Sequence, residues 1–309
     1  MAVLSVDLAY RRWSDLGIVV LDRARVAQLP GAGGILAPKL NIAAADQSGP
    51  ADGPIACEII SFAPPAEGPG PVDANILAGQ INHLCNIRNI RVIMLDGPQA
   101  WKSRSNGLEH SRVSERQLNT AAKTGLPGMV KPVTYRAFAE FCLDVYDALC
   151  RRGWRRWDTA GQPGTGQNRT GQNRTGQDRV PQDRVTQDRV TQDRVLVESY
   201  PHAAWKSLGL KPLPSKRRSR VSDLAEAYGA LRSIIPIATN RPPNHDQLQA
   251  IVGGLPGLAL EERNSGGTRI VGNPPRREDG HWREGFIVLP VPPLQPASLA
   301  WLNSLRWLD

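Results

Sequence analysis

Three apolar segments of the sequence each carry an acidic residue at or near their end. The segments read LSVDL, VIMLDGP and VLVESYP, and their acids are Asp7, Asp96 and Glu198. A fourth acid, Asp246, stands near the start of a later segment, HDQLQAIVGGL. Open α/β sheets place their sites at one edge, where the ends of neighbouring strands meet. We therefore expect these four carboxylates to converge, and we take them as candidate catalytic residues.

Carboxylates held close together repel one another, so some of them must hold a proton or share a cation. Their oxygen atoms are hard ligands, and no cluster of cysteine or histidine accompanies them in the sequence. Such a set favours Mg²⁺ or Mn²⁺ over zinc. Two such ions, about 3.5–4 Å apart, activate water and stabilise the leaving oxygen in phosphodiester hydrolysis. The pattern therefore predicts a metal-dependent nuclease.

Each acid also has an ordinary structural interpretation. Asp7 suits a hydrogen bond to the backbone at a turn, and Asp96 stands in the turn sequence DGP. Glu198 suits an ion pair with a nearby basic residue, and Asp246 suits the first turn of a helix, where its charge complements the helix dipole. The chemical interpretation depends on the acids meeting in space.

Hydrophobic periodicity predicts the elements that must position these acids. Apolar runs of strand length predict strands over residues 2–10, 17–22, 55–61, 91–96, 195–201 and 284–290. Helical spacing of apolar residues predicts helices over residues 72–87, 134–153, 203–208, 221–234 and 244–255. Three opening strands followed by helix-separated strands predict an α/β fold, with a mixed five-stranded sheet flanked by helices.

A five-residue repeat interrupts this pattern. Its arginines recur at every fifth position, at Arg169, Arg174, Arg179, Arg184, Arg189 and Arg194. This period matches neither helix nor strand, and the segment has too little apolar surface to offset its ordering entropy. We predict a disordered insert over 159–194 that divides one domain into 1–158 and 195–309. The alternative is an arginine-bearing arm that contacts phosphates.

The order of the acids along these elements resembles the RNase H-like fold. The chain more closely resembles the family called domain of unknown function 429, described as predicted nucleases of that fold. The matching segments are VDLAYRRWSDLGIVVL, VIMLDGPQAW, SRVSERQL, VESYPHAAWKSLGLKPLPSK, HDQLQAIVGGL and EGFIVLP. The resemblance implies that Asp7, Asp96 and Asp246 bind catalytic Mg²⁺ or Mn²⁺ ions, with Glu198 as a further catalytic residue.

The last matching helix departs from the family pattern at its end. The family pattern continues this helix, whereas Gly253, Gly254 and Pro256 are expected to end or kink it here. The repeat insert, which directly precedes the Glu198 strand, is a second departure. Both departures bear on activity more than on fold.

The basic residues predict an anionic partner. The chain has a net charge of +9, which permits binding to nucleic acid, DNA or RNA. Lys102, Arg112 and Arg116 follow the Asp96 strand, and Lys216 belongs to a second basic cluster. We predict that these four residues hold nucleic-acid phosphates. The alternative for such runs is a solvated surface.

Other sequence features narrow the class of protein. No apolar run approaches the roughly 18 residues of a membrane helix, and the N-terminus lacks the layout of a signal peptide. The four cysteines show no close pairing. These features predict a cytoplasmic protein with free thiols and no membrane contact. One alternative to a nuclease is a non-catalytic RNase H-like module that binds nucleic acid or protein. Another is a nucleotide-binding ATPase, which fits less well because the first turn, LAYRRWSDLG, is bulky and charged.

Overall fold

A computed structural model describes residues 1–23, 54–65, 70–158, 194–262 and 265–292 of the protein. Within these residues the centre of the fold is a nine-stranded sheet in the order β10-β13-β8-β4-β1-β2-β3-β9, with β7 paired to β8. The strands are β1 (Ala2–Asp7), β2 (Gly17–Asp22), β3 (Ile55–Ile60), β4 (Val92–Asp96), β7 (Arg155–Arg156), β8 (Val195–Ser199), β9 (Ile237–Thr239), β10 (Thr268–Val271) and β13 (Ile287–Pro290).

The directions of the central strands define the fold. Strand β2 lies antiparallel to both β1 and β3, whereas β4 lies parallel to both β1 and β8. The order β3-β2-β1-β4-β8, with these directions, is that of the RNase H-like fold. The predicted mixed sheet with flanking helices is therefore confirmed. The sheet extends beyond the five predicted strands, because short strands add to both of its edges.

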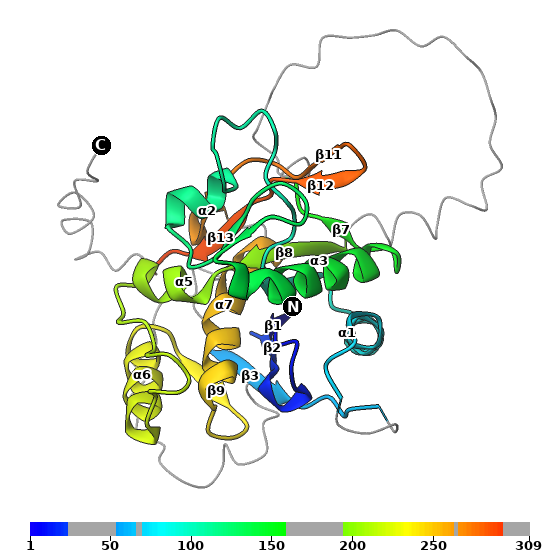
Figure 1. The fold of residues 1–309 in the computed structure, drawn as a ribbon. Coiled ribbons are helices and arrows are strands. Elements are labelled where there is room, and N and C mark those ends of the chain that lie inside the picture. Colours follow the sequence, from blue (N-terminus) through cyan, green and yellow to red (C-terminus); the bar gives the residue numbers. More distant parts are fainter. Residues whose placement is uncertain (24–53, 66–69, 159–193, 263–264, 293–309) are drawn as a thin grey trace, which may run out of the picture.

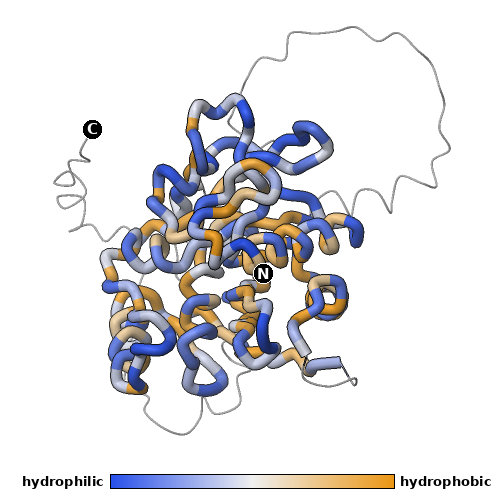
Figure 2. The backbone as a smooth tube through the Cα atoms, viewed as in Figure 1, coloured by the Kyte–Doolittle hydropathy of each residue, from blue (hydrophilic) through white to orange (hydrophobic). Residues whose placement is uncertain are grey.

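Helices cover both faces of the sheet (Figure 1). They are α1 (Ala74–Arg88), α2 (Val113–Leu118), α3 (Arg136–Cys150), α5 (Pro201–Ser207), α6 (Val221–Ile234) and α7 (His245–Glu261). Side chains alternate between the faces of each strand. Val3 and Met94 pack in the core beneath α7, whereas Leu4 and Ile93 pack in the core beneath α1 and α3. Figure 2 shows hydrophobic segments along the sheet and its helices, with hydrophilic ones in the outer loops.

Helix α7 continues through its glycines and proline to Glu261, so the expectation that it ends there is wrong. Its glycines face the sheet. A Cβ on Gly254 would lie 2.3 Å from Leu21 Cδ1, and one on Gly257 would lie 2.6 Å from Val3 Cγ1. The glycines therefore let α7 approach the strands more closely than any side chain would allow. This packing against the sheet offsets the low helix propensity of glycine and proline.

Two small hairpins stand apart from the main sheet: β5 (Lys123–Thr124) with β6 (Val130–Lys131), and β11 (Arg276–Glu278) with β12 (His281–Arg283). The four cysteines are all free thiols. In the part of the chain that the structure describes, no helix is long and apolar enough to cross a membrane. The repeat insert predicted over 159–194 lies, except for its last residue, outside the described residues.

Candidate active site

Asp7 and Asp96 end two adjacent parallel strands at the same level of the sheet. In the pairing of β1 with β4, Asp7 lies directly beside Asp96. Alternation along the strands directs both side chains to the face that α7 covers, since Val3 and Met94 pack on that face. The two carboxyl groups therefore face each other closely enough for the protonation of one to affect the pKa of the other.

Asp246 reaches this pair because α7 begins close to β2. Gly17, the first residue of β2, pairs with Asp7. A Cβ on Gly17 would lie 2.1 Å from the backbone oxygen of Asp246, so only glycine allows the helix to approach here. Asn244 caps the helix by accepting a hydrogen bond from the backbone of Gln247 at 2.9 Å. We call Asp7, Asp96 and Asp246 the acid edge.

Burial and neighbouring charges raise the pKa of two acids of the acid edge, Asp7 and Asp96. Burial raises the pKa of Asp7 well above its ordinary value, and the charges of Asp96 and Asp246 raise it further. Burial also raises the pKa of Asp96, to about 7, and the nearby charge of Glu198 adds to this effect. The Asp7–Asp96 pair therefore retains at least one proton near neutral pH unless a cation neutralises it.

Lys216 supplies a positive charge next to the acid edge. Its ammonium group forms ion pairs with Asp246 and, at 2.8 Å, with Asp15. The Lys216 side chain is 49% exposed. His245 lies on the other side of the Asp246 carboxylate, with its Nδ1 atom 3.1 Å from Asp246 Oδ1. The carboxylate of Asp246 is thus held by two basic side chains, whereas Asp7 and Asp96 are held by each other.

The acid edge offers the right kind of ligand for a hard divalent cation. Carboxylate oxygens are the groups that Mg²⁺ and Mn²⁺ prefer, and the raised pKa values of Asp7 and Asp96 indicate charge that a cation would stabilise. Within the described residues, however, no three His, Cys, Asp or Glu side chains are already grouped as a metal site. Asp246 would have to exchange Lys216 for the cation to complete the set.

Glu198 points to the other face of the sheet. In the pairing of β4 with β8, Asp96 lies beside Ser199, whereas Glu198 lies beside Leu95. Leu95 packs beneath α1 and α3, and side chains of paired residues share a face. The structure thus brings together Asp7, Asp96 and Asp246, and it separates Glu198 from them by the thickness of the strand.

A buried arginine neutralises Glu198. The Arg112 guanidinium donates to both carboxylate oxygens of Glu198, at 2.6 and 2.7 Å, and its Nε atom donates to Glu115 at 3.0 Å. The backbone of Gln99 donates to Glu198 at 3.1 Å, and the backbone of Thr124 donates to Glu115 at 2.9 Å. We call Arg112, Glu115 and Glu198 the arginine cluster.

The predicted phosphate-binding residues lie in different environments. Arg112 is 1% exposed and its donors serve the arginine cluster. Lys102 is 6% exposed and donates to the backbone oxygen of Ser103 at 2.9 Å. Lys216 pairs with acids beside the acid edge, and Arg116 is exposed on α2. Lys216 and Arg116 therefore reach solvent, whereas the side chains of Arg112 and Lys102 lie inside the protein.

Several residues of the site escaped the reasoning from sequence. Gly17, Asp15 and Glu115 each support an acid or its partner. They lie in the segments VDLAYRRWSDLGIVVL and SRVSERQL that carry the resemblance, but nothing in those segments indicated this role. The offset of Glu198 depends on where its strand ends, and the sequence placed that end at 201 instead of Ser199. With the two strands paired as the structure has them, Asp96 lies beside Ser199 and not beside Glu198. Because strand side chains alternate, that one-residue difference predicts opposite faces.

No family model matches the chain, and no curated protein matches it. Membership of domain of unknown function 429 therefore stays a prediction. Among solved structures, that of RuvC from Thermus thermophilus is similar at 11% identity and a TM-score of 0.32, covering 85% of this chain and 96% of that one. At so low a TM-score, the fold assignment rests on the order and directions of the central strands. The chain has an RNase H-like fold, and its activity must be argued from the site.

Proposed function

We propose that this protein is a metal-dependent nuclease that hydrolyses a phosphodiester bond of DNA or RNA at the acid edge. The observation that carries the proposal is the register of β1 and β4, which sets Asp7 and Asp96 side by side with raised pKa values. Two half-buried acids that lie side by side without a cation between them are costly for the fold, because the charge of each disfavours the charge of the other. A bound cation would relieve the repulsion between the two carboxylates, which favours cation binding at this pair.

The residues of the acid edge have distinct tasks in this proposal. Asp7 and Asp96 would hold Mg²⁺ or Mn²⁺ between the ends of their strands, and Asp246 would contribute from α7. A bound divalent ion supplies a nucleophilic hydroxide and stabilises charge on the phosphate oxygens. Lys216, released from Asp246, lies within reach of the same edge and is suited to contact a substrate phosphate.

The arginine cluster supports the acid edge from beneath. We propose a positioning role for Glu198, because Arg112 and the Gln99 backbone occupy both of its carboxylate oxygens. Its charge also helps to raise the pKa of Asp96. Glu198 would thus tune the acid edge without contacting substrate, and Arg112 would hold it in place.

A cleavage assay tests the proposal. The protein is incubated with labelled single-stranded, duplex and branched DNA and RNA, with Mg²⁺, Mn²⁺ or a chelator. We expect cleavage with metal, and its loss in the double variant Asp7→Asn/Asp96→Asn. Retained cleavage in that variant would refute the proposal. Nucleic-acid binding without metal, and no cleavage of any substrate, would favour the alternative, a non-catalytic binding module.

A further inference from the structure

A pocket of about 590 Å³ lies between the β1–β2 connection, the end of β3 and the segment that leads into α7. Its size falls within the range of about 300–1,000 Å³ that is typical of small-molecule sites. The residues that give it chemical character are Arg12, Trp13, Ser61, Phe62, Arg241 and Gln247.

The pocket adjoins the acid edge through two elements. The β1–β2 connection, which supplies Arg12 and Trp13, runs directly from Asp7 to Gly17. At the start of α7, the pocket residues Asn244, which caps the helix, and Gln247 lie on either side of Asp246 in the chain. A linear molecule that crosses the acid edge therefore finds this pocket beside it.

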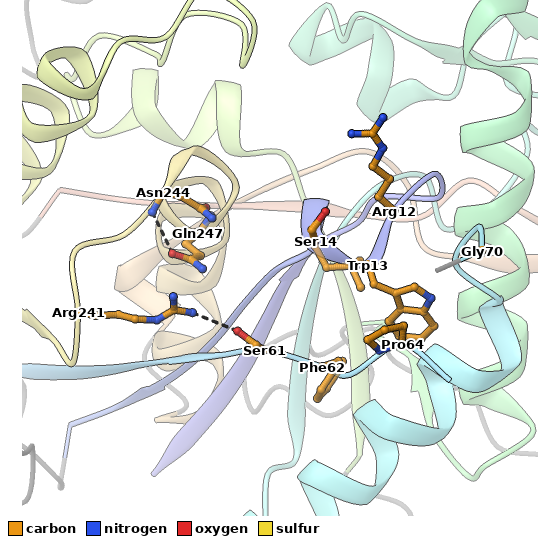
Figure 3. Close-up of a pocket in the computed structure, with 11 residues that line it drawn as sticks. Arg12, Trp13, Ser14, Ser61, Phe62, Pro64, Gly70, Arg241, Asn244 and Gln247 are labelled. Carbon is orange, nitrogen blue, oxygen red and sulfur yellow. Dashed lines mark hydrogen bonds between the residues drawn. The ribbon is translucent and has the colours of Figure 1, made fainter. Parts of the chain in front are cut away.

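One side of the pocket is polar and the other is aromatic (Figure 3). Arg241, Asn244 and Gln247 lie on the polar side, and Trp13 and Phe62 lie across from them. The Arg241 guanidinium donates to Ser61 Oγ at 3.2 Å. Among the described residues no carboxylate pairs with Arg241, so its charge is free to meet an anion.

We propose that this pocket binds one unpaired nucleotide of a single-stranded nucleic acid. The base lies against the half-buried ring of Phe62, which Trp13 backs from the core, and Arg241 holds the adjoining phosphate. Aromatic rings stack on any base, and arginine follows the backbone, so binding is tolerant of sequence. A base inside a duplex is already stacked and cannot enter. The proposal rests on the proposed function, since it names the substrate class of the acid edge.

Binding is measured with a fluorescein-labelled deoxythymidine oligonucleotide and its uridine counterpart, by fluorescence anisotropy in a chelator. Under these conditions no cleavage occurs. We expect Phe62→Leu, which keeps an apolar side chain but removes the ring, to weaken binding by about 5- to 150-fold. Phe62→Trp, which keeps a stacking surface, should bind as the unchanged protein does.

The arginine is tested through salt dependence. Arg241→Ala should lower the slope of log affinity against log salt by about 0.7, the value for one phosphate contact on a single strand. The exposed Arg232 on α6 lies outside the pocket. The matched control Arg232→Ala should leave both slope and affinity unchanged.

The outcomes separate this proposal from the proposed nuclease activity. Asp96→Asn, which should abolish cleavage, should still bind the oligonucleotide. Tighter binding of duplex than of single strand would overturn the pocket proposal, as would equal binding by Phe62→Leu and the unchanged protein. Either result leaves metal-dependent cleavage intact. Conversely, pocket-dependent binding without cleavage under any metal would refute the nuclease and keep the pocket.

Discussion

Two groups of acids lie near the ends of adjacent strands in this protein, on opposite faces of one sheet, and a helix adds one acid to each group. In the arginine cluster, Glu115 and Glu198 surround Arg112, and their oxygens accept hydrogen bonds from the guanidinium and the backbone. In the acid edge, Asp7 and Asp96 have each other as neighbours, and Asp246 meets Lys216, whose side chain is partly exposed. Acidic residues thus have a buried positive partner on one face of the sheet. On the other face they have no buried positive partner.

This difference indicates which group holds a complete ion pair and which group has charge that a cation could neutralise. A buried ion pair whose hydrogen bonds are complete resists change, because removing either partner leaves an uncompensated buried charge. A pair of acids with raised pKa values is destabilised until a proton or a cation arrives. Variants that remove charge from either group should therefore have opposite effects.

The largest effect is expected in the arginine cluster. Arg112→Met leaves Glu115 and Glu198 as buried, unpaired charges, which should lower the free energy of unfolding by about 3–5 kcal/mol. Urea denaturation measures this loss. Arg116→Met, at an exposed position of α2, the helix that Arg112 directly precedes, is the matched control and should stay within about 0.5 kcal/mol of the unchanged protein. A loss below about 1 kcal/mol for Arg112→Met would show that Arg112 is not the buried counter-charge of Glu115 and Glu198.

The stability of the protein should depend on pH through the acid edge. The pKa of Asp96 rises from 3.8 to about 7 on folding. The folded state therefore binds more protons than the unfolded state across this range, and the free energy of unfolding should fall as pH rises from about 4 to about 7. We expect a decline of roughly 1–4 kcal/mol in metal-free protein, measured by urea denaturation at several pH values. Asp96→Asn should flatten the decline. An equally steep decline in that variant would contradict the raised pKa.

The close approach of α7 is tested at Gly17. Gly17→Ala places a Cβ 2.1 Å from the backbone of Asp246 and must displace the start of α7. We expect a loss of about 1–3 kcal/mol in the free energy of unfolding. Cleavage should also fall, since Asp246 moves away from Asp7. The control is Gly229→Ala in α6, where a Cβ meets no atom within 4 Å; it should gain up to about 1 kcal/mol. Equal stability of the two variants would contradict the claim that α7 needs glycine at position 17 to approach β2.

The smallest effect is expected at Lys216. Its ion pairs are partly exposed, so Lys216→Met should change the free energy of unfolding by less than about 1 kcal/mol. Removing a cation that competes for Asp246 should strengthen Mn²⁺ binding, by about fivefold for about 1 kcal/mol. Calorimetric titration measures the Mn²⁺ affinity. The control is Arg218→Met, at an exposed position two residues away. Weaker Mn²⁺ binding would mean that Lys216 supports the site instead of competing for it.

The long apolar strands made much of the fold predictable. β1, β2, β3, β4 and β8 stand out because each is five or six residues of mostly apolar character. The apolar run over 284–290 also predicted β13. The other added strands, β7, β9 and β10, have two to four residues, too few for a periodic pattern, and their pairing depends on tertiary contacts. Helix α7 was predicted too short, because glycine and proline lower helix propensity in isolation while packing here requires glycine.

The candidate site was predictable only in part. Asp7 and Asp96 follow from the rule that parallel strands align their ends, and Asp246 follows from its place at a helix start. Glu198 looked equivalent because it also follows an apolar run. Its face depends on a one-residue register, and its partner Arg112 comes from a segment 86 positions away in the chain. No local pattern reports a contact of that kind.

Divalent cation binding to three proteins tests the central claim most directly. Mn²⁺ is titrated calorimetrically at a pH above 7 into the unchanged protein, Asp96→Asn and Glu198→Gln, after circular dichroism has shown that each is folded. We predict that Asp96→Asn weakens binding by at least about 10- to 100-fold, whereas Glu198→Gln retains binding. Unchanged binding in Asp96→Asn, or loss of binding in Glu198→Gln alone, would contradict the assignment of the acid edge as the cation site.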